Sequence, residues 1–206
     1  MLRNAFDHFL GRLYPYFWKY RHVWSKGWPD SYLYEESING KHRLKIVEAL
    51  RTFQPFESVL DYGCGPGANL FVLARHFQEA KLYGTDISLK AIECARETFK
   101  DFENINVWNL HDEACEKHEP WDVVITDAVF IYLKDPGKVI EDLKKSMTKG
   151  YIGCEWHSDC DESFVFGRHW VHNYRKLFEG CEITKIEWDV PDKGWDTYGH
   201  IITWKK

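Results

Sequence analysis

The sequence predicts an α/β fold in which a doubly wound, mainly parallel sheet carries helices on both faces. Short apolar runs typical of buried strands alternate along the chain with segments whose apolar residues recur at helical spacing. The 206 residues also suffice for one domain with a full core and a modest appendage, without internal repeats or low-complexity runs. These two observations together favour alternating strand and helix units within a single domain.

Residues 1–44 are expected to form an N-terminal helical cap or lid, and residues 45–206 the main domain. Apolar side chains recur at helical spacing up to Pro15, and the segment to Lys26 carries five basic residues against Asp7 alone. Such a helix either caps the core or rests on a membrane surface or a partner. The loop that follows offers three aromatic side chains that either close over a ligand or anchor the segment: Trp28, Tyr32 and Tyr34.

The remaining elements follow in order. A helix is expected over residues 41–53, strands at 58–62, 81–86, 104–110 and 121–126, and helices at 68–77 and 89–99. Ser88 suits the cap of the latter helix, and Asp135 with Pro136 is expected to open another that Gly150 ends. The last expected elements are a strand at 151–156, a helix at 167–178, and strands at 181–190 and 198–204. The final pair is joined too tightly for a crossover helix, so the last strand should run antiparallel.

A glycine-rich turn, Gly63-Cys64-Gly65-Pro66-Gly67, joins the first strand to the following helix. Glycine is needed where the backbone takes positive φ or where another molecule approaches bare peptide, so a ligand is expected here. The spacing also fits the dinucleotide fingerprint. However, Asp61 stands just before the first glycine, and no Lys or Arg occurs between Ser58 and Ala74. This arrangement suits a ligand with a positive charge better than a pyrophosphate.

The stretch from Leu60 to Gly67 resembles the first motif of the class I S-adenosylmethionine-dependent methyltransferases, hydrophobic-Asp-x-Gly-x-Gly-x-Gly. Asp86 ends the next strand about twenty residues on, where the ribose of either cofactor would be held. The resemblance covers roughly residues 45–205. It implies a seven-stranded sheet with one reversed strand, S-adenosylmethionine as cofactor, S-adenosylhomocysteine as product, and an acid on the adenine amino group at Asp112. The expected cofactor-binding residues are Asp61, Gly63, Cys64, Gly65, Gly67, Asp86, Ile87, Asp112, Glu113 and Asp127.

The acceptor is expected at the ends of the fourth and fifth strands, because ligands of doubly wound sheets lie beyond the carboxyl ends of the strands. His157 follows the fifth strand there, and Asp159 could orient its ring as a general base, although an ordinary polar residue at a strand end is an equal alternative. Tyr132 stands where family members frequently carry a histidine. The candidate catalytic residues are therefore His157, Tyr132 and Asp159.

His169 and His172 are expected to be neighbours on the helix at 167–178, where they could line the substrate pocket or bind a metal. Neither has a third ligand at suitable spacing, so no metal site is predicted.

Composition limits the remaining choices. Lys and Arg number 27 against 32 Asp and Glu, and the net charge of -5 offers no general attraction for nucleic acid or anionic lipid. The N-terminus has no unbroken apolar run, so neither a signal peptide nor a membrane span is expected. The six cysteines form no C-x-x-C pair, which favours free thiols in a reducing cytoplasm.

The sequence therefore predicts a cytoplasmic enzyme that methylates an oxygen or nitrogen of a small-molecule acceptor, such as a sugar or a secondary metabolite. An NAD-dependent oxidoreductase and a non-catalytic binding protein with a methyltransferase fold are the alternatives. No oligomeric state is predicted.

Overall fold

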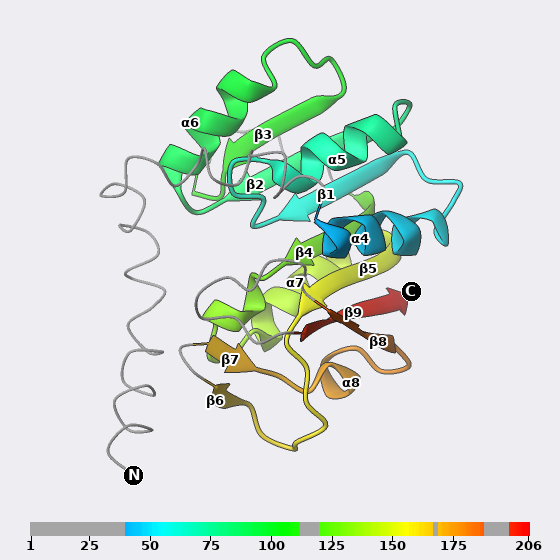
Figure 1. The fold of residues 1–206 in the computed structure, drawn as a ribbon, viewed down its shortest axis with the longest axis vertical. Coiled ribbons are helices and arrows are strands. Elements are labelled where there is room, and N and C mark those ends of the chain that lie inside the picture. The colour runs from blue at the N-terminus through cyan, green and yellow to red at the C-terminus, as the bar shows by residue number, and fades with distance from the viewer. Residues whose placement is uncertain (1–39, 112–119, 167–168, 188–197) are drawn as a thin grey trace.

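The computed structural model describes residues 40–111, 120–166, 169–187 and 198–206, which surround one large sheet (Figure 1). Residues 1–39 lie outside the described residues, and most of the expected N-terminal cap or lid lies there with them. The expected boundary after residue 44 falls inside helix α4 (Lys41–Arg51). Ile46, Val47 and Leu50 of this helix belong to the core on one face of the sheet. No helix of the described part of the chain is long and apolar enough to cross a membrane.

The sheet has seven strands in the order β3-β2-β1-β4-β5-β9-β8. The neighbours from β3 to β5 pair in parallel, and β9 runs antiparallel to both β5 and β8. The predicted fold class, including the single reversed strand, is confirmed. The strands are β1 (Ser58–Tyr62), β2 (Lys81–Asp86), β3 (Ile105–Asn109), β4 (Trp121–Asp127), β5 (Met147–Glu155), β8 (Glu182–Glu187) and β9 (Tyr198–Lys205).

Helices cover both faces of the sheet (Figure 1). Helices α4, α5 (Ala68–His76) and α6 (Leu89–Thr98) share one apolar cluster with the sheet, whereas α7 (Gly137–Ser146) and α8 (Tyr174–Leu177) share a second. The change of face follows from topology. The chain winds from β1 toward β3 and then from β4 toward β5, and right-handed crossovers in opposite directions place their helices on opposite faces. This reversal opens a crevice beyond the carboxyl ends of β1 and β4.

The expected helix over residues 167–178 is wrong. Residues 167 and 168 are not among those described, and His169–Val171 form a short strand, β7, paired antiparallel with β6 (Phe164–Phe166). Only the single turn of α8 is helical. Its start is fixed by Asn173, whose side-chain oxygen accepts hydrogen bonds from the backbone N–H groups of Arg175 and Lys176. Trp170 on β7, Tyr174 in α8 and Phe178 directly after it are all buried, and this reproduces the spacing that suggested one helix.

The expected helix end at Gly150 is also wrong, because α7 ends at Ser146 and β5 begins at Met147. A Cβ on Gly150 would clash with the carbonyl oxygen of Trp204 on the neighbouring strand β9. Gly150 therefore permits close approach of two strands rather than ending a helix. At its other end, α7 begins one residue later than expected, where Asp135 accepts a hydrogen bond from the Gly137 N–H at 3.1 Å.

Candidate active site

The glycine turn lies at the carboxyl end of β1, where it leads into α5. Gly63, Gly65 and Gly67 have φ values of 83°, 55° and 97°, a region that residues with a Cβ disfavour. The N–H groups of Gly63 and Cys64 donate to the carbonyl oxygen of Thr85 at 2.7 and 3.0 Å, which ties the turn to the end of β2. The predicted positive φ is confirmed, and contact of these glycines with a ligand remains a prediction.

Packing within the protein gives two of these glycines a second role. A Cβ on Gly63 would clash with Val129, and one on Gly67 would overlap the ring of Phe99. Cys64 is buried with its Sγ against Gly84, and burial raises the pKa of its thiol well above the ordinary value. The Cys64 side chain thus belongs to the core beneath the turn.

Asp61, at the end of β1, is fully buried, and neither of its carboxylate oxygens has a hydrogen-bond partner in the described part of the chain. Burial raises its pKa well above the ordinary value, the Asp127 and Asp86 charges add to the rise, and Arg43 opposes it. The Asn69 amide lies near enough to lower this pKa, although it does not reach hydrogen-bonding geometry. A buried carboxylate without partners is costly, and a cationic ligand would satisfy it.

Asp86 connects the end of β2 to the glycine turn. Its Oδ2 accepts from the Gly65 N–H at 2.9 Å and its Oδ1 from the Ser88 N–H at 2.7 Å, while Ser88 caps α6 as predicted. Burial raises the Asp86 pKa despite these bonds. Asn109, at the end of β3, donates to the carbonyl oxygens of Asp86 and Ile87 at 3.0 and 3.1 Å. Asn109 was not among the predicted site residues, although it ends β3 as Asp86 ends β2.

Asp127, at the end of β4, has a close contact with a histidine that sequence reasoning also missed. His42 Nε2 lies 3.4 Å from Asp127 Oδ2, and although burial alone would raise the Asp127 pKa, His42 and Arg43 lower it to about 2. Both basic residues come from the first turn of α4. Arg43 is buried on the helix face that also carries Ile46 and Leu50. A charged residue at an apolar position of the helical pattern was the signal that could have identified it.

On the predicted acceptor side, His157 and Asp159 contact one another as predicted, with Nε2 and Oδ1 3.2 Å apart. The other ring nitrogen, Nδ1, accepts a hydrogen bond from the Tyr174 N–H at 3.2 Å, and Arg175 lies 3.0 Å from the same Asp159 oxygen. Burial lowers the His157 pKa, and the Asp159 charge opposes this change. Since a base must offer a free lone pair, proton uptake by His157 would require the Tyr174 bond to break. The catalytic role of His157 remains a prediction with that condition attached.

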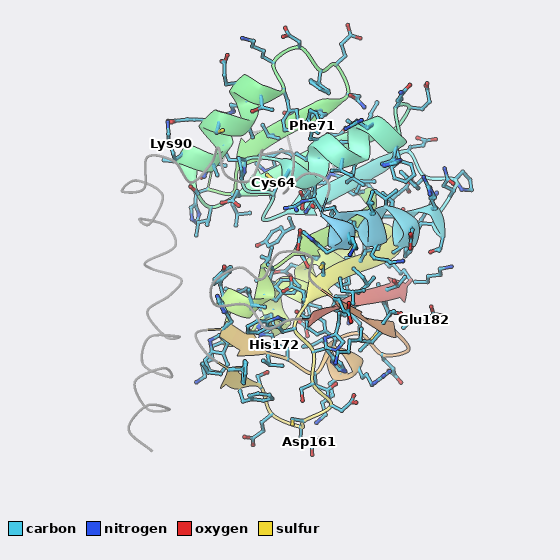
Figure 2. All side chains as sticks on the ribbon, viewed as in Figure 1. Cys64, Phe71, Lys90, Asp161, His172 and Glu182 are labelled. Atoms are coloured by element: carbon cyan, nitrogen blue, oxygen red, sulfur yellow. The ribbon has the colours of Figure 1, made fainter. Side chains whose placement is uncertain are left out.

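Tyr132 lies on a short 3-10 helix, η1 (Phe130–Tyr132), directly after β4, and its ring meets that of His169 edge-on at 5.3 Å. His169 and His172 are not neighbours on one helix. His172 instead makes hydrogen bonds with Ser163 Oγ at 2.8 Å and with the carbonyl oxygen of Phe130 at 3.0 Å. Figure 2 labels Cys64, which lies in the glycine turn, and His172, which follows β7.

Glu155, at the end of β5, carries a fully buried carboxyl group and was not among the predicted site residues. Its Oε1 accepts from Thr126 Oγ1 at 2.8 Å and from the N–H groups of Val129 and Phe130 at 3.0 and 3.3 Å, whereas Oε2 has no partner among the described residues. Burial raises its pKa to about 7 against these hydrogen bonds. Glu155 thereby holds the start of the segment that carries Tyr132.

Asp112 and Glu113, the residues predicted to meet the adenine, lie outside the described residues, and so do the aromatic lid candidates near the N-terminus. Their roles remain predictions.

A family profile described as "Methyltransferase domain" matches residues 55–201. Malonyl-[acyl-carrier protein] O-methyltransferase of Acetivibrio thermocellus is 32% identical over 89 residues, covering 43% of this chain and 31% of that protein. Trans-aconitate 2-methyltransferase of Pseudomonas aeruginosa is 33% identical over 115 residues, covering 53% of this chain and 38% of that protein. The matched segments therefore span well under half the length of these relatives.

Solved structures resemble the fold over most of the chain. Magnesium protoporphyrin IX methyltransferase of Synechocystis PCC 6803 with bound SAH gives a TM-score of 0.59 at 18% identity, covering 81% of this chain and 82% of that one. A chain from the complex of a putative methyltransferase with the Trm112 activator of Haloferax volcanii gives 0.61 at 16% identity, covering 89% and 96%. Because the profile matches most of the chain and the folds agree, the protein belongs to the methyltransferase-domain family, with the fold of the class I S-adenosylmethionine-dependent methyltransferases.

Proposed function

We propose that the protein transfers a methyl group from S-adenosylmethionine to an oxygen or nitrogen of a small-molecule acceptor. The observation that carries this proposal is the buried Asp61 carboxylate, which has no hydrogen-bond partner among the described residues and lies near two further acids, Asp86 and Asp127. Such a group of carboxylates favours a ligand with positive charge. Both the sulfonium and the ammonium group of S-adenosylmethionine carry one.

The residues present fit this cofactor. Asp61 would face its positively charged part, while Arg43, whose charge acts on Asp61 and Asp127, would offer a cation for its carboxylate. Asp86 would hold the ribose. Its oxygens accept hydrogen bonds from backbone N–H groups, and a carboxylate has about four acceptor sites, so capacity for a ribose hydroxyl group remains. The adenine contacts are assigned to Asp112 and Glu113 by family resemblance alone.

When bound, S-adenosylmethionine supplies a methyl group on a positively charged sulfur, and the charge on that sulfur is lost as the methyl group leaves. The protein then contributes alignment and exclusion of water, and such positioning supplies about 7–11 kcal/mol in well-oriented systems. Glu155 supports this alignment by holding the backbone that follows β4. Tyr132, His157 and Asp159 are assigned to the acceptor side, with His157 as the candidate base for an acceptor that must lose a proton.

The names of the relatives leave the acceptor open, because they act on molecules as different as malonyl-[acyl-carrier protein] and trans-aconitate. A small acceptor is proposed because the net charge of -5 gives no general attraction for nucleic acid. A reducing, cytoplasmic setting is supported by the cysteines of the described part of the chain, which are free: Cys64, Cys94, Cys154, Cys160 and Cys181.

Calorimetric titration with S-adenosylmethionine, S-adenosylhomocysteine and NAD tests the proposal. Binding of both adenosyl compounds but not of NAD is expected. NAD binding without response to either adenosyl compound would establish the oxidoreductase alternative instead. Cofactor binding without release of S-adenosylhomocysteine across a broad acceptor panel would favour the non-catalytic binding protein.

A further inference from the structure

A hollow lies at the carboxyl end of β5, beneath the hairpin formed by β6 and β7. Side chains from three parts of the chain line it: the residues directly after β5, the hairpin, and the start of β9. Because β5 neighbours β4 in the sheet, the hollow lies on the acceptor side of the crevice. Its lining residues are Trp156, His157, Ser158, Phe164, Phe166, Val171 and His200.

A row of ring contacts leads from the end of β4 toward this hollow. Tyr132 meets His169 edge-on at 5.3 Å, His169 meets Trp156 at 5.3 Å, and Trp156 meets Phe166 at 6.1 Å, the last two also edge-on. The row begins five residues after Asp127, whose carboxylate belongs to the cofactor side. An acceptor whose ring binds at the far end of the row would therefore extend from that ring along aromatic side chains toward the cofactor crevice.

The hollow is uncharged. None of its described lining residues is Lys, Arg, Asp or Glu. Its two histidines are held neutral, since burial lowers the pKa of His157 and lowers that of His200 to about 4. The backbone N–H of His157 also donates a hydrogen bond to Nδ1 of His200 at 3.3 Å, which fixes the orientation of the His200 ring. A carboxylate or phosphate group on the acceptor would find no countercharge on this described lining.

Phe164 and Phe166 are exposed at the mouth of the hollow, with 39% and 48% of their surfaces accessible. They stand two apart on β6 and so face the same way, and Val171, directly opposite Phe164, lies on that face as well. Exposed aromatic side chains that converge on one hollow are typical of a binding site for an apolar ring.

We infer that the acceptor presents an uncharged aromatic ring, which binds in the hollow against Trp156 and Phe166, and that the oxygen or nitrogen that is methylated lies on the part of the acceptor that reaches the cofactor crevice. This inference rests on the proposed function. The lone pair of that oxygen or nitrogen forms the new bond to carbon, the carbon–sulfur bond breaks, and its electrons remain on sulfur as a neutral thioether. A hydroxyl acceptor releases its proton to His157 once the Tyr174 N–H has left Nδ1 of that ring, and a neutral nitrogen without a hydrogen has none to release.

Three matched probes test the inference by ligand-observed NMR on the full chain, with and without S-adenosylhomocysteine. They are 2-naphthol, its saturated counterpart 2-decalol, and the anion 2-naphthoate. The aromatic alcohol is expected to bind at least about tenfold more tightly than the other two, because aromatic contacts add to simple apolar burial. Phe166→Ser should weaken its binding by about tenfold, and Phe164→Ser should act in the same direction.

The control variant is Phe102→Ser, which removes an equally exposed aromatic ring just before β3, at the opposite edge of the sheet, and should leave binding unchanged. Any one of three results would overturn the inference. They are no binding of 2-naphthol at millimolar concentration, equally tight binding of 2-decalol or 2-naphthoate, and unchanged 2-naphthol affinity in Phe166→Ser. If S-adenosylhomocysteine still binds in that case, the proposed function stands. If S-adenosylhomocysteine does not bind, the proposed function fails, regardless of whether 2-naphthol binds.

Discussion

Asp86 offers the sharpest test of the site at the scale of a single residue. Its carboxylate fixes the Gly65 and Ser88 N–H groups, so Asp86→Ala removes two charge-assisted hydrogen bonds as well as the proposed ribose contact. Bonds of this kind contribute about 1.5–3 kcal/mol each, and S-adenosylhomocysteine binding should weaken by about 100-fold or more. Calorimetry measures this directly, and Asp86→Asn, which keeps one acceptor oxygen, should fall in between.

Asp122 provides the matched control for that substitution. Its carboxylate also accepts a backbone N–H, that of Glu57 at 2.6 Å, but it lies at the amino end of β4, away from the glycine turn. Asp122→Ala should leave affinity unchanged. Equal losses in both variants would mean that Asp86 acts only through overall stability.

Single residues also show what the sequence could and could not reveal about the site. Asp61 and Asp86 were predicted because each ends a buried strand beside the glycine turn, a local feature. The pairing of His42 with Asp127 joins residues 85 positions apart, and no local pattern encodes it. Glu155 resembled any strand-end acid, and its raised pKa depends on burial that only the folded chain supplies.

At the scale of elements, the turn between β1 and α5 can be compared with the one after α8. Gly67→Ala adds a Cβ where φ is 97° and where the ring of Phe99 occupies the space, whereas Gly180, with φ 78°, has nothing within 4 Å of an added Cβ. Gly180→Ala should lower the unfolding free energy by about 1–2 kcal/mol for its backbone conformation alone. Gly67→Ala should lower it by about 2–5 kcal/mol, because overpacking is added. Urea unfolding measures both, and equal losses would exclude the packing contribution at Gly67.

Elements with strong local signals were the ones predicted well. The Ser88 cap and the glycine turn follow from side-chain and backbone preferences within a few residues. The hairpin of β6 and β7 was missed because strand pairing, rather than local preference, decides it: Val165 and Trp170 become partners only when the chain folds back. Such pairing choices are only weakly encoded in the residue preferences along a single sequence.

At the scale of the whole molecule, several buried ionisable groups make stability depend on pH in opposing directions. The carboxyl of Glu155 has a folded-state pKa of about 7, above the ordinary 4.5, so the folded chain keeps a proton that the unfolded chain releases. Its stabilising contribution is complete below about pH 4.5 and is lost as pH rises through about 7. His157, His172 and His200 have lowered pKa values, so they favour the folded state increasingly as pH rises through about 6.5.

The contribution of Glu155 can be isolated because Glu155→Gln keeps an acceptor oxygen for the Val129 and Phe130 N–H groups but cannot titrate. Relative to wild type, the variant should gain about 3 kcal/mol of unfolding free energy between pH 4.5 and pH 8, since one pKa unit corresponds to about 1.4 kcal/mol. Urea unfolding of the ligand-free protein across this range measures the difference, and the histidine contributions cancel in it. The exposed Glu103→Gln should instead give a curve parallel to that of wild type. A parallel curve for Glu155→Gln as well would mean that Glu155 is ionised in the folded protein across this range.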